Sequence, residues 1–246
     1  MTASNPTRRQ LVGTAAALAA VSSATAVASI ASPARAQEAS ASAGDQQDLV
    51  YLGTYKGEPI AWRAIAQEGD RTLLVCDQII ASRPYHSVVV DAITWEECTL
   101  RAWLNGEFLE SCFTPDEAER IQVTTLQNAD NAEYGTPGGN PTEDKVFLLS
   151  DEECELYFEN PEDRVTTFSH QAALEWRDWV AVNHEIFGMD VNAFDPAALE
   201  AGLGWWVLRS PGQGAYWVSG VMTTGELYAT GHCYHVCAVR PAMWIS

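Results

Sequence analysis

The sequence predicts a single α+β domain with a mainly antiparallel sheet and several short helices. Runs rich in β-branched and aromatic residues lie near both ends of the domain, whereas helix-start signals lie between them. Strands at the two ends with helices in between are typical of α+β folds. We therefore expect the first and last strands to meet in one sheet.

The first elements are three predicted strands over residues 48–55, 58–66 and 71–77. Lys56-Gly57 and Gly69-Asp70 separate them, and both pairs are typical of tight turns. Connections this short favour an antiparallel meander.

Helix-start signals follow in the middle of the chain. In a Ser/Thr-x-x-Glu pattern the hydroxyl caps a backbone N–H, and the Glu side chain reaches back to the capping residue. Such patterns begin at Thr94, Thr114 and Ser150. A fourth helix is predicted from the helical spacing of apolar residues. The predicted helices span residues 95–108, 115–120, 150–158 and 169–184.

The rest of the chain carries further strand signals. The predicted strands span residues 121–126, 145–149, 205–209, 215–219, 226–229 and 238–244. A Gly/Asn/Pro-rich loop over residues 128–144 separates the first two, and Ser210-Pro211-Gly212 and Thr224-Gly225 are turn signals between the later ones.

The N-terminal region has the pattern of an export signal. Arg8-Arg9 precedes an uncharged, Ala-rich stretch that ends at Ala34-Arg35-Ala36, which is typical of a twin-arginine signal peptide. We expect residues 1–36 to be this signal, residues 37–47 a flexible linker and residues 48–246 one globular domain. The alternative is an uncleaved N-terminal anchor. We therefore predict an extracellular or cell-envelope protein with no stable membrane insertion after signal cleavage.

The charge of the chain limits its partners. It has 33 Asp and Glu against 14 Lys and Arg, a formal net charge of −19. Binding to nucleic acid or to an anionic membrane needs clustered Lys and Arg, which this chain lacks. We expect no nucleic-acid partner and interpret the acidity as solubility outside the cell. Calcium binding by scattered carboxylates stays open as the alternative.

Five motifs occur in an order and spacing that cover residues 49–245. They are Trp62-Arg63 and residues 94–105, 144–150, 205–212 and 239–242. Together they resemble one bacterial family, the domain of unknown function number 6273, and this resemblance implies no activity. The helix pair followed by Trp-rich strands is also similar to C-type-lectin-like and formylglycine-generating-enzyme-like folds. The resemblance thus implies a C-type-lectin-like single domain.

The shared motifs are predicted to be mainly structural. Their indole groups supply large apolar area, and each buried N–H needs a partner. The tryptophans assigned to the core are Trp95, Trp103, Trp205 and Trp206. The arginines Arg101, Arg209 and Arg240 lie among apolar residues, so we expect each to meet a carboxylate or backbone carbonyls.

The segment from Gly231 to Cys237 is the sharpest chemical feature of the sequence. It holds the thiols of Cys233 and Cys237 and the imidazoles of His232 and His235, in a spacing that matches no zinc motif. Three interpretations stay open: a Cys233–Cys237 disulfide or free structural thiols, a ligand-facing loop, and a metal or thiol-redox site. We assign no metal and no cofactor.

Glycan recognition would need exposed aromatic residues, and several lie near turns. The candidate binding residues are Tyr134, Trp217, Tyr228, His232, Tyr234 and His235. We predict an exported, non-catalytic binding module for a surface glycan or protein, with no catalytic residue assigned. The alternative is an exported metal- or thiol-dependent enzyme centred on Cys233 and Cys237, and a purely structural envelope protein is the third class.

Overall fold

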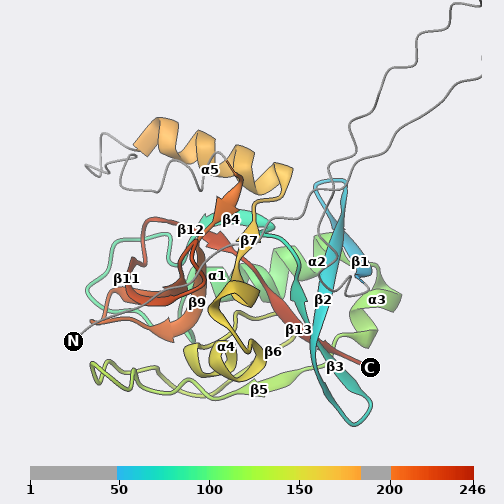
Figure 1. Cartoon of the computed structure of the whole chain (residues 1–246), viewed down its shortest axis with the longest axis horizontal. Helices are drawn as coiled ribbons and strands as arrows, with labels where there is room; N and C mark the ends of the chain where they lie inside the picture. The colour runs from blue at the N-terminus through green and yellow to red at the C-terminus, as the bar shows by residue number, and fades with distance from the viewer. Residues whose placement is uncertain (1–48, 184–200) are drawn as a thin grey trace, which may run out of the picture. The chain divides into compact units, whose positions relative to one another are not determined.

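The computed structural model describes residues 49–183 and 201–246, all within the compact unit Asp45–Ser246. The predicted signal peptide and linker, residues 1–47, lie outside the described residues. The described part of the chain is a mixed helix and sheet structure whose named strand pairs are all antiparallel (Figure 1). This confirms the predicted class of a mainly antiparallel fold with short helices.

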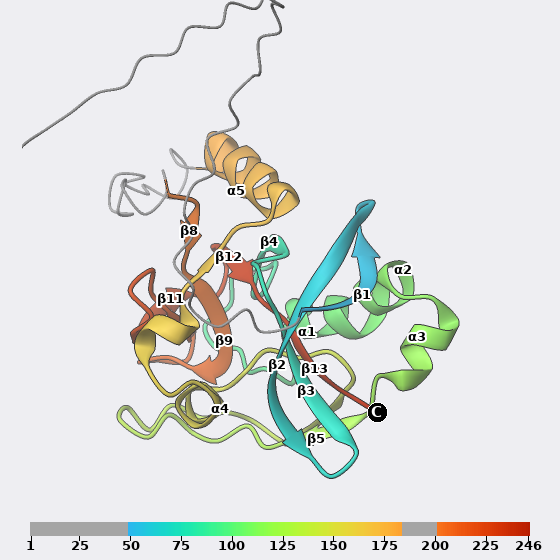
Figure 2. The same ribbon diagram turned by 45° about the vertical axis from the view of Figure 1, so that its right-hand side comes forward.

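The largest sheet joins the two ends of the domain. Its order is β1-β2-β3-β13, with strands β1 Val50–Tyr55, β2 Glu58–Glu68, β3 Arg71–Cys76 and β13 Ala242–Ile245. The turn at Lys56-Gly57 has positive φ at both residues, 49° and 88°, as a two-residue type I′ hairpin requires. β13, coloured red, runs beside β3 (Figure 2). The predicted sheet between the first and last strands is thereby confirmed.

Smaller sheets complete the strand set. A three-stranded sheet has the order β11-β10-β9, with β9 Trp206–Pro211, β10 Trp217–Val221 and β11 Leu227–His232. The two-stranded pairs are β4 Ala81–Pro84 with β12 Val236–Val239, β5 Thr124–Leu126 with β6 Thr142–Asp144, and β7 Thr166–Thr167 with β8 Leu203–Gly204. Strands as short as β4, β7 and β8 show too little alternation to be predicted from sequence.

Two of the three predicted capping boxes are present. Helix α3, Pro115–Arg120, starts at Thr114, and helix α4, Asp151–Tyr157, starts at Ser150, each with both reciprocal hydrogen bonds. The box at Thr94 is wrong. Helix α1, Thr99–Trp103, begins only after Cys98, whose sulfur accepts the hydrogen bond of Arg101 N.

The remaining helices include one irregular continuation. A π-helical turn, η1 Leu104–Phe108, carries α1 into α2, Leu109–Cys112, so the helical path extends beyond the predicted end. A 3₁₀ turn, η2 Pro161–Arg164, precedes α5, His170–Asn183, which matches the predicted helix over residues 169–184 as far as the described residues reach.

The predicted strand over residues 145–149 is wrong. Val146 to Leu149 are fully buried, but only Phe147 makes a bridge, with Ala242. The side-chain oxygen of Asn105 accepts from Lys145 N and Val146 N, so a side chain replaces the strand partner there. A continuous apolar run therefore crosses the core without joining a ladder.

The predicted strand over residues 238–244 is two strands, β12 and β13. Pro241 has no N–H to donate and interrupts the ladder, and Arg240 between the strands is fully buried. Its Nε donates to Cys76 O at 2.8 Å and its Nη1 to Arg164 O at 3.0 Å. The guanidinium also lies 5.0 Å from the ring centroid of Trp206.

One continuous hydrophobic core lies between these elements. An aromatic group at its centre joins Tyr55, Trp103, Phe108 and Phe113, with neighbouring ring centroids 5.0–6.3 Å apart. Each such side chain contributes several kcal/mol on burial, since large-to-Ala changes of aromatic core residues cost about 3–5 kcal/mol. The core holds β9 and α4 in the positions that form the pocket described next.

Candidate functional site

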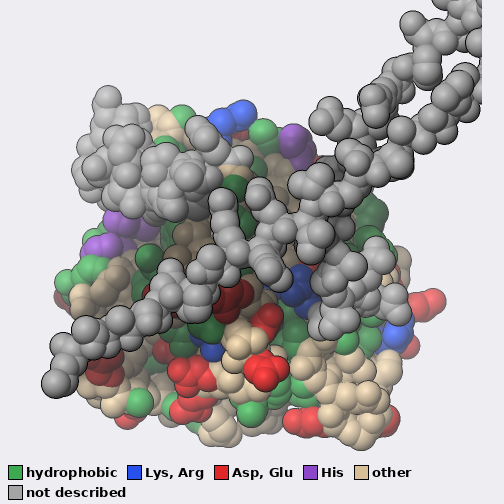
Figure 3. Space-filling view, in the orientation of Figure 1, with side chains coloured by type: hydrophobic (Ala, Val, Ile, Leu, Met, Phe, Trp, Pro, Cys, Tyr) green, Lys and Arg blue, Asp and Glu red, His purple; other side chains and the backbone are tan. Residues whose placement is uncertain are grey.

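A pocket opens beside helix α4 and the end of strand β9. Its volume is about 680 Å³, within the range of about 300–1,000 Å³ typical of small-molecule sites. Four segments contribute most of its lining: residues 124–134, 150–157, 209–211 and 227–229. Asp and Glu side chains gather over α4 on this face of the molecule (Figure 3). The pocket thus joins the end of the 144–150 motif to the 205–212 motif.

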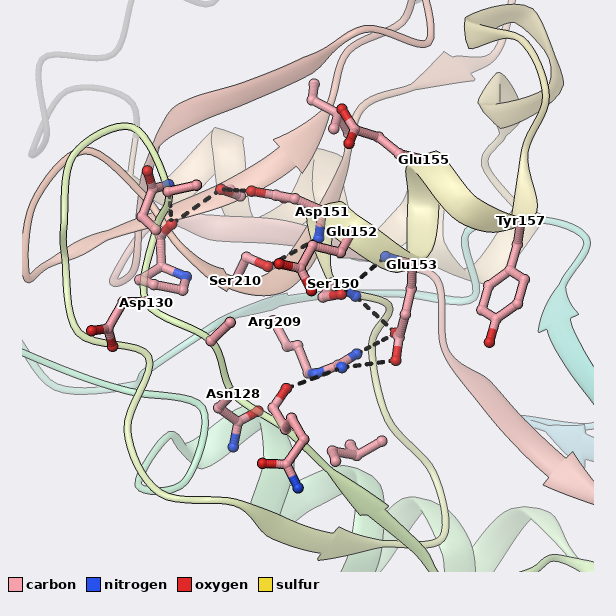
Figure 4. Close-up of a pocket in the computed structure, with 18 of the residues that line it drawn as sticks. Asn128, Asp130, Ser150, Asp151, Glu152, Glu153, Glu155, Tyr157, Arg209 and Ser210 are labelled. Atoms are coloured by element: carbon pink, nitrogen blue, oxygen red, sulfur yellow. Dashed lines mark hydrogen bonds and ion pairs between the residues drawn. The ribbon is translucent and has the colours of Figure 1, made fainter.

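The first turn of α4 is tied to β9. Ser150 Oγ accepts from Glu153 N at 3.1 Å, and the Glu153 carboxylate accepts from Ser150 N at 3.0 Å. Ser210 Oγ accepts from Asp151 N at 3.0 Å. Carboxylates are favoured in the first turn of a helix because the free N–H groups there carry partial positive charge. Asp151 and Glu153 are therefore held firmly at the pocket (Figure 4).

Arg209 forms the buried cationic part of the pocket wall, with a side chain that extends toward Glu153 (Figure 4). The residue is 5% exposed, and both terminal nitrogens pair with the Glu153 carboxylate, Nη2 with Oε1 at 2.8 Å. Its Nη1 also donates to Leu148 O at 2.8 Å. Because the Arg209 side chain is buried and that of Glu153 is partly buried, removing Glu153 would leave the guanidinium without its counter-charge.

The loop between β5 and β6 forms the opposite wall, and polar side chains shape it. Asn131 Oδ1 accepts from the backbone N–H groups of Glu133 and Tyr134, both at 3.0 Å, while its Nδ2 donates to Pro211 O at 2.8 Å. Asp130 Oδ1 accepts from Gly138 N at 3.0 Å. A Cβ at Gly138 would lie 2.3 Å from two backbone oxygens of the same loop, so only glycine fits there.

Three buried polar atoms around this pocket have no hydrogen-bond partner. They are Asp151 Oδ1, Asn128 Oδ1 and Arg209 Nε. Buried polar groups are nearly always satisfied in native proteins, and exceptions often mark a site that a ligand or ion completes. Two of the three are acceptors and one is a donor, so the wall of the pocket holds unused hydrogen-bonding capacity of both kinds.

Asp151 is a carboxylate of the pocket whose pKa is raised. Burial, with smaller contributions from Glu155 and Glu152, raises the pKa of Asp151 to about 6, although the hydrogen bond from Ser219 and the charge of Arg209 oppose this. Ser219 Oγ lies 2.9 Å from Asp151 Oδ2 and is the donor in that bond. A carboxylate held in a cleft with a raised pKa is a functional-site candidate.

The structure divides the predicted binding residues between two places. Tyr134, 47% exposed, and Tyr228 line the pocket. The other four, together with Tyr216, form what we call the aromatic cluster, made of Tyr216, Trp217, His232, Tyr234 and His235. They lie outside the lining of the pocket, so the six predicted residues do not form a single site.

The aromatic cluster centres on His232, whose ring centroid lies 3.9 Å from that of Trp217 and 4.8 Å from that of His235. Strand β10 begins only at Trp217, so Tyr216 lies before it, and the rings of both residues contact His232. Burial lowers the pKa of His235 to about 4 and also lowers that of His232. Both imidazoles are therefore neutral at physiological pH.

The cysteines of this segment are buried thiols. Cys233 and Cys237 are free in the structure, and Cys237 Sγ donates to His235 O at 3.4 Å. Burial raises the pKa of Cys233 and brings that of Cys237 to about 12, so both are protonated at neutral pH. A reactive cysteine instead has a lowered pKa. The Cys233–Cys237 disulfide stays a prediction for the exported protein.

The residues assigned to structural roles lie in or against the core. Trp95 Nε1 donates to Asp144 Oδ2 at 3.0 Å, and Arg101 Nε donates to Asp144 Oδ1 at 2.7 Å. Trp206 Nε1 donates to Arg164 O at 3.1 Å. Trp205 is half-buried and its ring contacts those of Trp176 and Tyr228. Burial lowers the pKa of Arg240 to about 10.

Sequence reasoning did not find Asp151, Ser210 or Ser219 as site residues. Asp151 was interpreted only as part of a capping box, and Ser210 only as part of a turn. A signal was nevertheless present, because Ser150 directly follows the apolar run of the 144–150 motif and Ser210 lies two residues after the apolar run of the 205–212 motif.

Neither a metal cluster nor a membrane-spanning helix is found in residues 49–183 and 201–246. No group of three or more His, Cys, Asp or Glu side chains in that part of the chain is arranged to hold a metal ion. None of its helices has the length and apolar character needed to cross a bilayer.

Comparison with known proteins gives one informative result. No curated protein and no solved structure matches the chain. A family profile, described as a domain of unknown function (DUF6273), matches residues 69–246, most of the described chain. The match begins at the turn between β2 and β3, so the Trp62-Arg63 motif lies before it. With its helices, its C-terminal strands and the pocket within the matched region, the chain belongs to the DUF6273 family.

Proposed function

We propose that this protein is an exported, non-catalytic binding module that recognises a surface glycan in the pocket between α4, β9 and the loop after β5. The observation that carries the proposal is the set of unpartnered atoms around the pocket: Asp151 Oδ1, Asn128 Oδ1 and Arg209 Nε. Sugar hydroxyls both donate and accept hydrogen bonds, so they can satisfy acceptors and a donor at once.

Aromatic faces at the pocket support the same ligand class. Tyr134 lies on the loop at the edge of the pocket with nearly half of its surface exposed, and the half-buried Tyr157 projects from α4. Ligand sites combine such apolar faces with a few placed polar groups. A concave site of this size suits a small part of a glycan better than a flat protein surface, which buries about 800 Å² per partner in a standard complex.

The aromatic cluster and the thiols do not support the enzyme alternative. The two imidazoles of the aromatic cluster have lowered pKa values, and the thiols of Cys233 and Cys237 have raised pKa values. A thiol-dependent enzyme needs a thiolate, which these environments disfavour. We therefore place the function at the pocket and assign the side chains of Cys233 and Cys237 to the core.

A glycan array followed by titration calorimetry tests the binding proposal. We expect the wild-type protein to bind at least one glycan class, and Tyr134→Ala and Asn128→Ala to weaken that binding by about tenfold each, a loss typical of one stacking or hydrogen-bonding contact. Tyr51→Ala is the matched control, because Tyr51 is 66% exposed on β1, outside the pocket. Wild-type protein that binds no glycan would contradict the proposal.

Export and the detailed fold belong to the same proposal. Arg8→Lys with Arg9→Lys should block export, and the exported protein should begin at Gln37. Undiminished export of the double variant would remove the twin-arginine assignment. The C-type-lectin-like arrangement is supported by the antiparallel strands and by the sheet that joins both ends of the domain. Superposition of a crystal structure on a C-type lectin domain tests that arrangement.

A further inference from the structure

The charge of the pocket goes beyond what a neutral sugar requires. Seven carboxylates line it against two guanidinium groups. Each guanidinium is already paired, Arg71 with Glu68 at 2.6 Å and Arg209 with Glu153. Within the described residues, no Lys or Arg forms an ion pair with the remaining carboxylates, which are those of Asp130, Glu133, Asp151, Glu152 and Glu155. The field in the pocket is therefore negative, which disfavours anionic ligands and favours cations.

Asp151 is the carboxylate best placed to hold a cationic group. Its Oδ2 accepts from Ser219, whereas Oδ1 is buried and unpartnered. Its backbone N–H is bound by Ser210, and α4 is capped by Ser150, so the side chain starts from a fixed backbone. In the described part of the chain no Lys or Arg forms an ion pair with it.

The loop on the opposite wall of the pocket adds hydrogen-bonding groups to this electrostatic attraction. Asn128 Oδ1 is a second unpartnered acceptor, and Asn128 Nδ2 is held by Asn140 O at 2.6 Å, which fixes the amide orientation. Figure 4 shows Asn128 and Asp130 on the loop that faces α4. An ammonium group offers three donors and no acceptor, so it can donate to an unpartnered oxygen of this kind.

We propose that the pocket selects a glycan that carries a free amino group, with the ammonium held by Asp151. This inference rests on the proposed function, since it names the class of sugar that the pocket takes. A charge-assisted hydrogen bond is roughly twice as strong as a neutral one. N-acetylation removes the positive charge, and a sugar carboxylate would be repelled, so both neutral acetylated and acidic sugars should bind more weakly.

The same arrangement makes binding depend on pH. With its pKa raised to about 6, mainly by burial, Asp151 is charged above that value and neutral below it. The charged groups that act on it are Glu152 and Glu155 on α4 and Arg209 on β9, and Ser219 on β10 is its hydrogen-bond donor. Binding of an ammonium ligand should therefore fall as the pH drops through about 6, where Asp151 becomes neutral, and should also fall at alkaline pH, where the amino group of the sugar loses its proton.

Calorimetric titration of the full exported domain with three oligosaccharide probes tests the inference. The probes are an oligomer of glucosamine, an oligomer of N-acetylglucosamine and an oligomer of a uronic acid. At pH 7.5 we expect the glucosamine oligomer to bind roughly tenfold or more tighter than the other two. Asp151→Asn should remove most of that preference, and the affinity of the variant should no longer fall between pH 7.5 and pH 5. Thermal melting checks that the variant is folded.

Glu110→Gln is the matched control, because it removes one negative charge from an exposed position on α2 outside the pocket. It should leave the preference within about twofold of wild type. Equal affinity for the glucosamine and N-acetylglucosamine oligomers would overturn the inference and leave glycan binding intact. If Glu110→Gln and Asp151→Asn lost the preference for the glucosamine oligomer equally, the preference would come from net charge alone, which would also overturn the inference. No binding of any glycan would reject the proposed function itself.

Discussion

Asp144 and Asp151 lie seven residues apart in the chain, and their surroundings differ in a way that separates fold from function. Asp144 is 1% exposed and accepts from Arg101 Nε, Trp95 Nε1 and Thr142 Oγ1 at 2.7, 3.0 and 2.8 Å. Asp151 has one side-chain donor, Ser219, and one buried oxygen with none. Both carboxylate oxygens of Asp144 accept hydrogen bonds from the protein, whereas one carboxylate oxygen of Asp151 accepts none.

The difference shows what an unsatisfied group costs and why it is retained. Burial of a carboxylate without compensation disfavours its charged form, which is why the pKa of Asp151 is raised. At neutral pH the folded protein therefore carries an ionised Asp151 carboxylate, although burial favours the protonated form. Such a cost is usual at sites where a ligand supplies the missing partner.

The largest predicted effect is at Asp144. Asp144→Ala should lower the free energy of unfolding by about 3–5 kcal/mol, because the partly buried charge of Arg101 and the buried indole N–H of Trp95 would both lose their acceptor. Urea unfolding followed by tryptophan fluorescence measures this. Glu143→Ala, at the exposed neighbouring position on β6, is the control and should stay within about 0.5 kcal/mol of wild type. A small loss for Asp144→Ala would erase the contrast with Asp151.

The next effect has the opposite sign and lies at Asp151. An unfolded Asp titrates near 3.9, and the folded pKa is about 6, so the folded state binds the proton more tightly. Stability is therefore lost as the pH rises from about 4 to about 6. Asp151→Asn removes this loss and should raise the free energy of unfolding by about 1–3 kcal/mol at pH 7.5.

The pH dependence of Asp151→Asn distinguishes this explanation from a general packing effect. Below about pH 4 the native carboxyl is protonated in both the folded and the unfolded state, so the variant should have no advantage there. Unfolding curves for both proteins between pH 3.5 and 8 give the comparison. A variant that is less stable than wild type at pH 7.5 would show that the Asp151 charge is compensated in the free protein.

Local sequence rules predicted the parts of the fold that depend on neighbours in the chain. The boxes at Thr114 and Ser150, the Lys56-Gly57 turn and the helix α5 all follow from residues a few positions apart. The box at Thr94 failed because Cys98, four residues later, provides the cap. A sequence pattern cannot decide between two capping residues that compete within one turn.

The pocket depends on contacts that local rules do not reach. Arg209 and Glu153 are 56 residues apart, and Asp151 and Ser219 are 68 apart. The sequence predicted that Arg209 would meet a carboxylate or carbonyls, but not which ones. The unpartnered oxygen of Asp151 is even harder to predict, since it depends on no hydrogen-bond donor being placed beside it in the folded chain. Exposed aromatics were a better guide for Tyr134 than for Trp217, which packs against His232.

The smallest effect is predicted for the two capping boxes. They are chemically alike, but only one of their helices carries residues that line the pocket. Ser150→Ala and Thr114→Ala should each cost about 1 kcal/mol of unfolding free energy, the usual loss for one N-cap hydroxyl. Only α4 carries pocket residues, and Ser150 also lines the pocket itself. Ser150→Ala should therefore weaken glycan binding severalfold, whereas Thr114→Ala should leave it unchanged. Urea unfolding and calorimetric titration of both variants provide the two readouts. If both variants lose stability equally and neither changes binding, the first turn of α4 does not position the ligand site. The contrast between structural and binding residues would then rest on Asp151 alone.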